Sequence, residues 1–233
     1  MSMNWNDFET VFSQARVGRY KSRYHGNEVQ AMTAYLHNLR ISESLTPFFS
    51  TVEIALRNSM HKQLGAYFGR IDWWETWAGN RAYRGQVDRI QAAYSKLLRR
   101  REPTTPDKVV AELTFGFWAT LFNVEFQHTL WSPLRKAFPN CPKLQRQRKT
   151  VAALVNTLRD MRNRAFHHEP VLWLSPDVGT VYEDGLKLVS WIHGPVEAWL
   201  VNLTRVHTTW SDWKFAEASF AMRMDRISSA PVR

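Results

Sequence analysis

The sequence has a single cysteine, Cys141, and no long apolar run. One cysteine cannot form an internal disulfide bond or a cysteine-based zinc site, which excludes both scaffolds and indicates a reducing compartment. No run approaches the roughly 20 apolar residues that span a bilayer. The first residues also lack the basic and apolar regions of a secretory signal. We therefore predict a cytoplasmic protein that is not inserted in a membrane.

Acidic residues are scarce relative to basic ones. Lys and Arg number 31 against 21 Asp and Glu, which gives a formal net charge of +10. This excess indicates a polyanionic partner such as nucleic acid or an acidic membrane surface. The membrane surface is disfavoured because the basic residues are not paired with an exposed apolar face on one helix.

Several signatures of catalysis and ligand binding are missing. The sequence has no HExxH zinc motif, glycine-rich phosphate loop, GxSxG elbow or paired-aspartate nuclease signature. The adjacent His167 and His168 would diverge by about 100° on a helix, which does not suit one zinc ion. We therefore expect no metal and no cofactor, and a structural role for Cys141.

Helical periodicity is present almost throughout the chain. Apolar residues recur at helical spacing from Phe48 to Met60 and from Val151 to Ala165. Further helices are expected over 28–43 and 81–101, and Gly194-Pro195 splits a C-terminal pair. Helix starts, each with a hydroxyl cap and a proline in the first turn, are predicted at Thr46-Pro47, Thr105-Pro106, Ser132-Pro133 and Ser175-Pro176.

No internal repeat or low-complexity linker divides the chain. We predict one all-α domain over residues 1–233, with a motif helix at about 142–168 and C-terminal helices at about 177–226. The best candidate for an exposed joint is the segment 99–104. Most of the tryptophans are predicted to lie in the core, namely Trp73, Trp74, Trp77, Trp118, Trp191 and Trp199.

Arg162 occupies an unusual place on the motif helix. It lies about 20° from Val151 on the helical wheel, in the middle of the apolar stripe. An arginine on the packed side of a helix needs a carboxylate, a phosphate or an interface to offset its desolvation. Glu53, at the edge of its own apolar stripe, is a candidate partner, or it forms an ordinary i, i+4 pair with Arg57.

Two histidines follow at the predicted helix end. Pro170 disfavours helical geometry at Glu169, so the helix should end around His167 or His168. Residues five apart on a helix point about 140° apart, so Arg162 and His167 of one copy cannot easily grip one phosphate. Either the last turn deforms or two copies share a cleft, and we favour the second, which predicts a homodimer.

The approach to this motif is strongly basic. Charge runs are commonly only solvated faces, but here the geometry of Arg162 favours a functional surface. The residues predicted to contact an RNA backbone are Lys143, Arg146, Arg148, Lys149, Arg159 and Arg164.

The segment Arg162-Asn163-Arg164-Ala165-Phe166-His167 matches the RNxxxH form of the R-x(4–6)-H motif of HEPN-domain ribonucleases. Leu158–Pro170 resembles their Abi-like (abortive infection) branch, as do Val52–Asn58, Asp72–Trp74 and Leu113–Trp118. The resemblance covers roughly 12–203. It implies a HEPN-type helical bundle with additional helices, usually dimeric, with metal-independent endoribonuclease activity.

The same resemblance implies a role in phage defence or as a toxin. An antitoxin or a guide or regulatory RNA is then a candidate partner besides the RNA substrate. The bare motif is weak evidence, since it also matches from Arg19 to His25, where we expect no helix end. The asparagine, the helical context and the His-His-Glu-Pro ending make the match at Arg162 more specific.

The motif residues suit RNA cleavage without a metal. A histidine can exchange a proton with the ribose 2′-hydroxyl or the leaving oxygen near neutral pH, and DNA lacks that nucleophile. Arg162 offers a fixed charge to the phosphate, and Asn163 orients the histidine or a phosphate, or only caps the helix. His168 is a second acid–base group or an exposed neighbour. Glu169 orients a histidine or repels the substrate.

The sequence therefore predicts an endoribonuclease that cleaves single-stranded RNA, with Arg162, His167 and Asn163 as catalytic residues. The alternative is a non-catalytic helical module that binds RNA or a partner protein through the same basic face. Such a module would bind with a steep dependence on salt and form no product.

Overall fold

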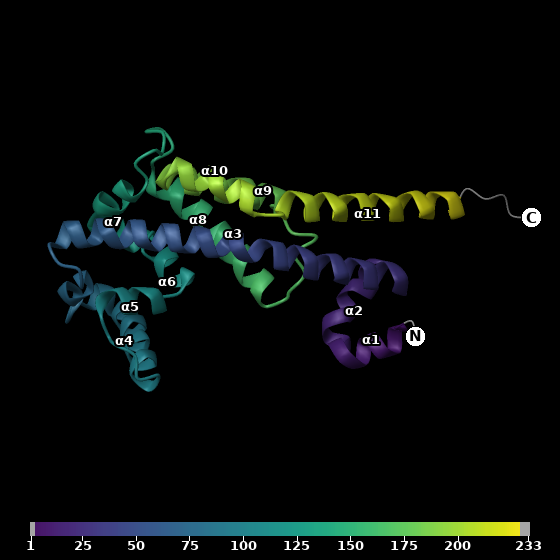
Figure 1. The fold of residues 1–233 in the computed structure, drawn as a ribbon, viewed down its shortest axis with the longest axis horizontal. Helices are drawn as coiled ribbons and strands as arrows, with labels where there is room; N and C mark the ends of the chain where they lie inside the picture. Colours follow the sequence, from purple (N-terminus) through teal and green to yellow (C-terminus); the bar gives the residue numbers. More distant parts are fainter. Residues whose placement is uncertain (1–2, 229–233) are drawn as a thin grey trace, which may run out of the picture. The chain divides into compact units, whose positions relative to one another are not determined.

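The computed structural model describes residues 3–228 and confirms the all-α fold (Figure 1). Among these residues there is no strand, and no helix combines the length and the apolar character needed to cross a membrane. The α-helices are α1 (Trp5–Phe12), α2 (Gln14–Arg23), α3 (Glu28–Phe68), α4 (Arg84–Arg99), α5 (Pro106–Glu112), α6 (Phe115–Thr120), α7 (Gln127–Leu134), α8 (Arg148–Phe166), α9 (Val178–Ile192), α10 (Gly194–Leu203) and α11 (Val206–Ser228). Short 3-10 helices lie at Trp73–Trp77, Arg81–Tyr83, Val124–Phe126 and Arg135–Ala137.

The described chain forms two compact units, each assembled from separate stretches of sequence. The terminal unit consists of the described residues up to Pro47, of Met161–Tyr182 and of the residues from Thr204 onward. The central unit consists of Phe48–Asp160 and Glu183–Leu203. The divisions fall inside α3, α8 and α9 and after α10, and the segment 99–104, the predicted joint, lies within the central unit. One domain over 1–233 stays a prediction, and residues 1–2 and 229–233 lie outside the described part.

Two of the four predicted helix starts are wrong. Pro47 lies inside α3, and Pro133 lies inside α7, so neither proline begins a helix. Proline removes one backbone N–H and crowds the preceding turn, but α3 keeps buried side chains on both sides of that position, including Leu45 and Phe48. Packing therefore outweighs the local cost, and the predicted helix 28–43 continues to Phe68.

The other two starts agree in position but not in the predicted hydroxyl cap, because the Thr105 side chain makes no cap hydrogen bond and Pro176 lies just before α9. Thr105 is the N-cap of α5, and Pro106 is its first residue. Helix α9 begins just after Pro176, where the Asp177 carboxylate accepts a hydrogen bond from the Thr180 N–H at 2.8 Å. The split at Gly194-Pro195 is also confirmed, since α10 begins at Gly194.

The motif helix starts later than the predicted 142. Helix α8 begins at Arg148, and the preceding residues form turns in which the N–H groups of Gln145 and Arg146 bond to the Pro142 carbonyl. The guanidinium group of Arg146 donates to the Cys141 carbonyl at 2.7 Å and closes this turn. The C-terminal helices cover 178–228, close to the predicted 177–226.

Aromatic side chains make up much of the core of the central unit. Trp73, Trp77 and Trp118 are fully buried, and Trp77 stacks on Tyr83 with ring centroids 4.4 Å apart. Their predicted core positions are confirmed, as are those of Trp74 and Trp191. Trp199 on α10 is 56% exposed, so its predicted core position is wrong.

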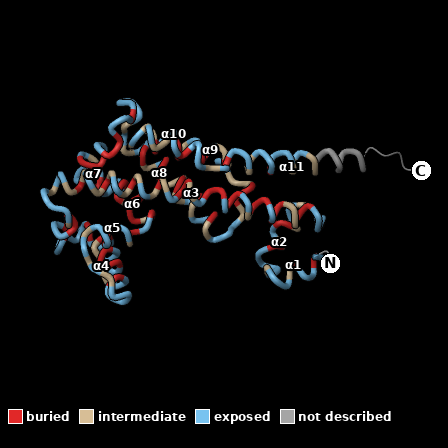
Figure 2. The backbone as a smooth tube through the Cα atoms, in the orientation of Figure 1, coloured by how far each residue is buried: buried red, intermediate tan, exposed pale blue. Residues whose placement is uncertain are grey.

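A second aromatic cluster holds the terminal unit together. Tyr20 of α2 contacts Tyr35 of α3 with ring centroids 5.3 Å apart, and it contacts Trp173 at the same distance. Trp213 of α11 is fully buried and lies 5.6 Å from His37. Figure 2 shows buried positions recurring along α3. This packing fixes α2 against α3 and against the segment that follows α8.

Candidate functional site

Helix α8 ends in a Schellman motif, a C-terminal cap with two reversed hydrogen bonds. The His168 N–H donates to the Ala165 carbonyl at 3.1 Å, and the Glu169 N–H donates to the Arg164 carbonyl at 2.9 Å. The last helical residue is Phe166. The predicted helix end at the two histidines is therefore confirmed, and Pro170 follows the cap as expected.

His168 occupies the left-handed position of this cap, with φ of 55°. Glycine is the usual residue there, because a side chain in that conformation costs roughly 1–2 kcal/mol. Strain of this kind is concentrated at functional sites. The imidazole also borders a hollow of about 280 Å³ that Leu39, Ser42 and Phe166 help to line.

We expect His168→Gly to raise the free energy of unfolding by about 0.5–1 kcal/mol, because glycine adopts this conformation without a Cβ clash. Urea denaturation of both proteins measures the change. His168→Ala, which keeps a Cβ, should not stabilise the protein. Equal stability of the wild type and the glycine variant would show that the position is not strained.

The segment after the cap is held by two side chains from other helices. Asn38 of α3 is fully buried; its amide donates to the Glu169 carbonyl at 3.2 Å, and its oxygen accepts from the Val171 N–H at 2.8 Å. Arg16 of α2 donates through Nη1 to the His168 carbonyl at 3.2 Å. These bonds fix the backbone that carries both histidines.

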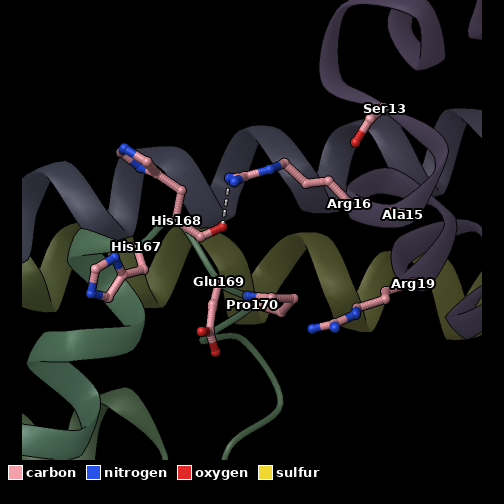
Figure 3. Close-up of a pocket in the computed structure, with 8 residues that line it drawn as sticks. All are labelled: Ser13, Ala15, Arg16, Arg19, His167, His168, Glu169 and Pro170. Atoms are coloured by element: carbon pink, nitrogen blue, oxygen red, sulfur yellow. Dashed lines mark hydrogen bonds between the residues drawn. The ribbon is translucent and has the colours of Figure 1, made fainter.

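An open pocket of about 370 Å³ lies between this segment and α2. Figure 3 shows Arg16 and Arg19 extending from α2 toward the turn after α8, with the two imidazoles pointing in different directions. The lining residues are Ser13, Ala15, Arg16, Arg19, His167, His168, Glu169 and Pro170. His167 and His168 are exposed, so their imidazoles are open to a ligand.

Arg162 lies in the last turns of α8 and is half-buried. It is therefore less buried than the helical wheel predicts but more buried than a surface arginine. Its guanidinium carbon lies 4.6 Å from the centroid of the Phe166 ring. Its Nη1 donates to the Asn163 side-chain oxygen at 3.4 Å. Asn163 thus contacts the arginine, and among the described residues its side chain makes no hydrogen bond to His167.

The predicted RNA-contacting residues differ in what their side chains do. Arg146 bonds to the Cys141 carbonyl, and Arg148 donates to the Phe122 carbonyl at 2.7 Å and to Gln127 at 2.9 Å. Both guanidinium groups therefore bind groups of the protein itself, and their contact with RNA stays a prediction. Lys143 and Lys149 are exposed.

Salt bridges occupy the other two predicted arginines. Arg159 is paired with Asp160 at 2.8 Å, and Arg164 lies 3.4 Å from the Glu169 carboxylate. Of the six predicted residues, only Arg164 belongs to the terminal unit that carries His167.

Glu53 and Arg57 lie on α3 in the central unit, and both are half-buried. Arg57 donates to Asn58 at 3.3 Å and to the Ala111 carbonyl at 3.4 Å. The pairing predicted between Glu53 and Arg162 stays a prediction.

Three other reactive groups, His37, His61 and Cys141, are buried or half-buried. Burial lowers the pKa of His37 and of His61, and the His61 Nδ1 accepts a hydrogen bond from the Trp73 indole at 2.9 Å. Burial raises the pKa of the Cys141 thiol, which keeps it protonated at neutral pH and supports its structural role. Among the described side chains, no three His, Cys, Asp or Glu residues gather as metal ligands would.

Three residues of the site escaped the sequence analysis. Arg16 and Arg19 are three apart on the exposed face of α2, opposite the buried Val17, and that basic spacing was a usable signal. Asn38 sits among buried positions of α3 such as Tyr35, where a polar side chain needs partners. The expectation about Arg19 to His25 was wrong, because α2 ends at Arg23, just before His25.

Comparisons with models of known protein families, with curated protein sequences and with solved structures find no match for this chain.

Proposed function

We propose that this chain is a metal-independent endoribonuclease of the HEPN type, which cleaves single-stranded RNA by attack of the ribose 2′-hydroxyl. The observation that supports this most is the pocket that joins two exposed histidines to two arginines, Arg16 and Arg19. Histidine and arginine together provide proton transfer and charge stabilisation for phosphoryl transfer. A role in phage defence or as a toxin is part of the proposal, on the resemblance of the motif alone.

The proposed reaction needs one proton removed and one proton delivered. His167 takes the proton of the 2′-hydroxyl while that oxygen bonds to phosphorus, and the bond from phosphorus to the 5′ oxygen breaks. The leaving oxygen receives a proton, and the neighbouring imidazole of His168 is the candidate donor. The products are a 2′,3′-cyclic phosphate and a 5′-hydroxyl. DNA is not a substrate because it lacks the nucleophile.

Arg162 has a supporting place in this proposal. Its guanidinium group is held between the Phe166 ring and the Asn163 oxygen, so its direction is restricted. A fixed guanidinium stabilises phosphorane charge with little reorganisation. Because Arg162 and His167 point about 140° apart on a regular helix, a second copy of the chain remains our proposal for how Arg162 reaches substrate.

Purified protein should cleave a single-stranded RNA in the presence of EDTA and leave a DNA strand of the same sequence intact. Gel analysis of both strands over time provides the measurement. Binding of RNA without product, with affinity that falls steeply with salt, would instead favour the non-catalytic module. Exposed Lys143 and Lys149 and the net charge of +10 support RNA binding under either function.

A further inference from the structure

The face of α2 that lines the pocket is basic and well supported. Arg16 and Arg19 lie on this face, and both are exposed, while the neighbouring Val17 and Tyr20 are fully buried. Residues three apart on a helix share a face, so both guanidinium groups can reach one ligand. The buried pair anchors α2, and the arginines are therefore presented from a fixed element.

The two arginines differ in how they are engaged. The Arg16 guanidinium group makes one hydrogen bond, to the His168 carbonyl, and it has five N–H donors, so most of them are available. The Arg19 guanidinium group makes no hydrogen bond or ion pair with any described residue. In Figure 3 its guanidinium group extends toward Glu169 and Pro170.

The charge balance of the pocket favours an anion. Its single carboxylate, on Glu169, lies 3.4 Å from the guanidinium group of Arg164, which is not among the lining residues. That pairing offsets the negative charge. The other charged groups of the lining are the two guanidinium groups of α2, and the two imidazoles become positive when they are protonated. Forked guanidinium donors suit phosphate oxygens.

We infer that α2 supplies the phosphate-binding half of the site: Arg19, together with Arg16, holds a phosphodiester of single-stranded RNA beside His167 within one chain. The inference rests on the proposed function for the identity of the polyanion and adds residues outside the RNxxxH motif. It also answers a geometric difficulty. On a regular helix Arg162 and His167 would point about 140° apart, whereas Arg16 and Arg19 line the same pocket as His167.

The test uses an RNA that cannot be cleaved, so that binding is measured apart from catalysis. The probe is a single-stranded 2′-O-methyl oligonucleotide with a fluorescent label, titrated with protein over a range of salt concentrations. The matched variants are Arg19→Ala and Arg40→Ala. Arg40 is an exposed arginine of α3 in the same unit that does not line the pocket, so both variants lose one positive charge.

Arg19→Ala should weaken binding about tenfold at moderate salt, because it removes charged hydrogen bonds to phosphate. The plot of log affinity against log salt has a negative slope, and the substitution should make that slope less steep by about 0.7, the value for one phosphate contact on a single strand. Arg40→Ala should change both quantities much less. Arg19→Lys keeps the charge and should retain the slope, and thermal melting of each variant checks folding.

Equal affinity and slope for Arg19→Ala and Arg40→Ala would overturn the inference, as would failure of the wild type to bind the probe. The proposed function is judged separately, by cleavage of ordinary RNA in EDTA. A wild type that cleaves while the two variants bind alike refutes only the phosphate site. A selective loss of binding in Arg19→Ala without any cleavage by the wild type supports the site and refutes the nuclease.

Discussion

His167→Ala should reduce cleavage of single-stranded RNA by about 10²–10⁴-fold, the usual contribution of a positioned acid–base group. The thermal midpoint should not fall, because His167 is exposed and its imidazole makes no hydrogen bond with any described residue. Initial rates in EDTA, measured on a labelled RNA at saturating concentration, give the loss in kcat. Differential scanning calorimetry gives the midpoint.

His128→Ala is the matched control for this variant. His128 is an exposed histidine of α7 in the central unit and does not line the pocket, so its removal should leave the rate unchanged. If His167→Ala kept the rate of the control, the catalytic base would lie elsewhere in the chain.

Asn38→Ala should lower the free energy of unfolding by about 2–4 kcal/mol. The substitution removes two hydrogen bonds and leaves the buried Val171 N–H without its acceptor. Cleavage should fall as well, by about 10²-fold, because the segment carrying His167 loses its anchor on α3 and small misplacements are costly in catalysis. Urea denaturation and RNA cleavage of the same preparation measure the two effects.

Asn58→Ala makes the same chemical change at an exposed position of the same helix, where the side chain only accepts a bond from Arg57 at 3.3 Å. Its stability should change by less than about 0.5 kcal/mol. An Asn38→Ala protein as stable as this control would mean that Asn38 does not hold the histidine segment.

Local signals in the sequence predicted the end of α8 well. The residues that decide it are neighbours: Pro170 excludes helical geometry at Glu169, and the cap then forms at His168. The same reasoning failed at Pro47, where the local rule predicts a start but buried side chains on both flanks keep α3 continuous. Contacts between distant segments decide such positions, and a single sequence does not reveal them.

In the candidate site, too, neighbouring residues could be predicted from the sequence, and contacts between distant segments could not. His167 and Arg162 were predicted because they lie close together in the chain, at the end of α8. Arg19 lies far from them in the chain and comes to the pocket only when α2 packs against the other parts of the terminal unit. The hydrogen bonds of Arg146 and Arg148 were not predicted for a related reason, because charge alone does not reveal which carbonyl groups of the protein accept from a guanidinium group.

The most direct test of the account is the chemistry of the RNA ends formed by the wild type in EDTA, read by mass spectrometry. Attack by the 2′-hydroxyl predicts 5′ fragments that end in a 2′,3′-cyclic phosphate and 3′ fragments that begin with a 5′-hydroxyl. Intact RNA, or fragments with 3′-hydroxyl and 5′-phosphate ends, would contradict it.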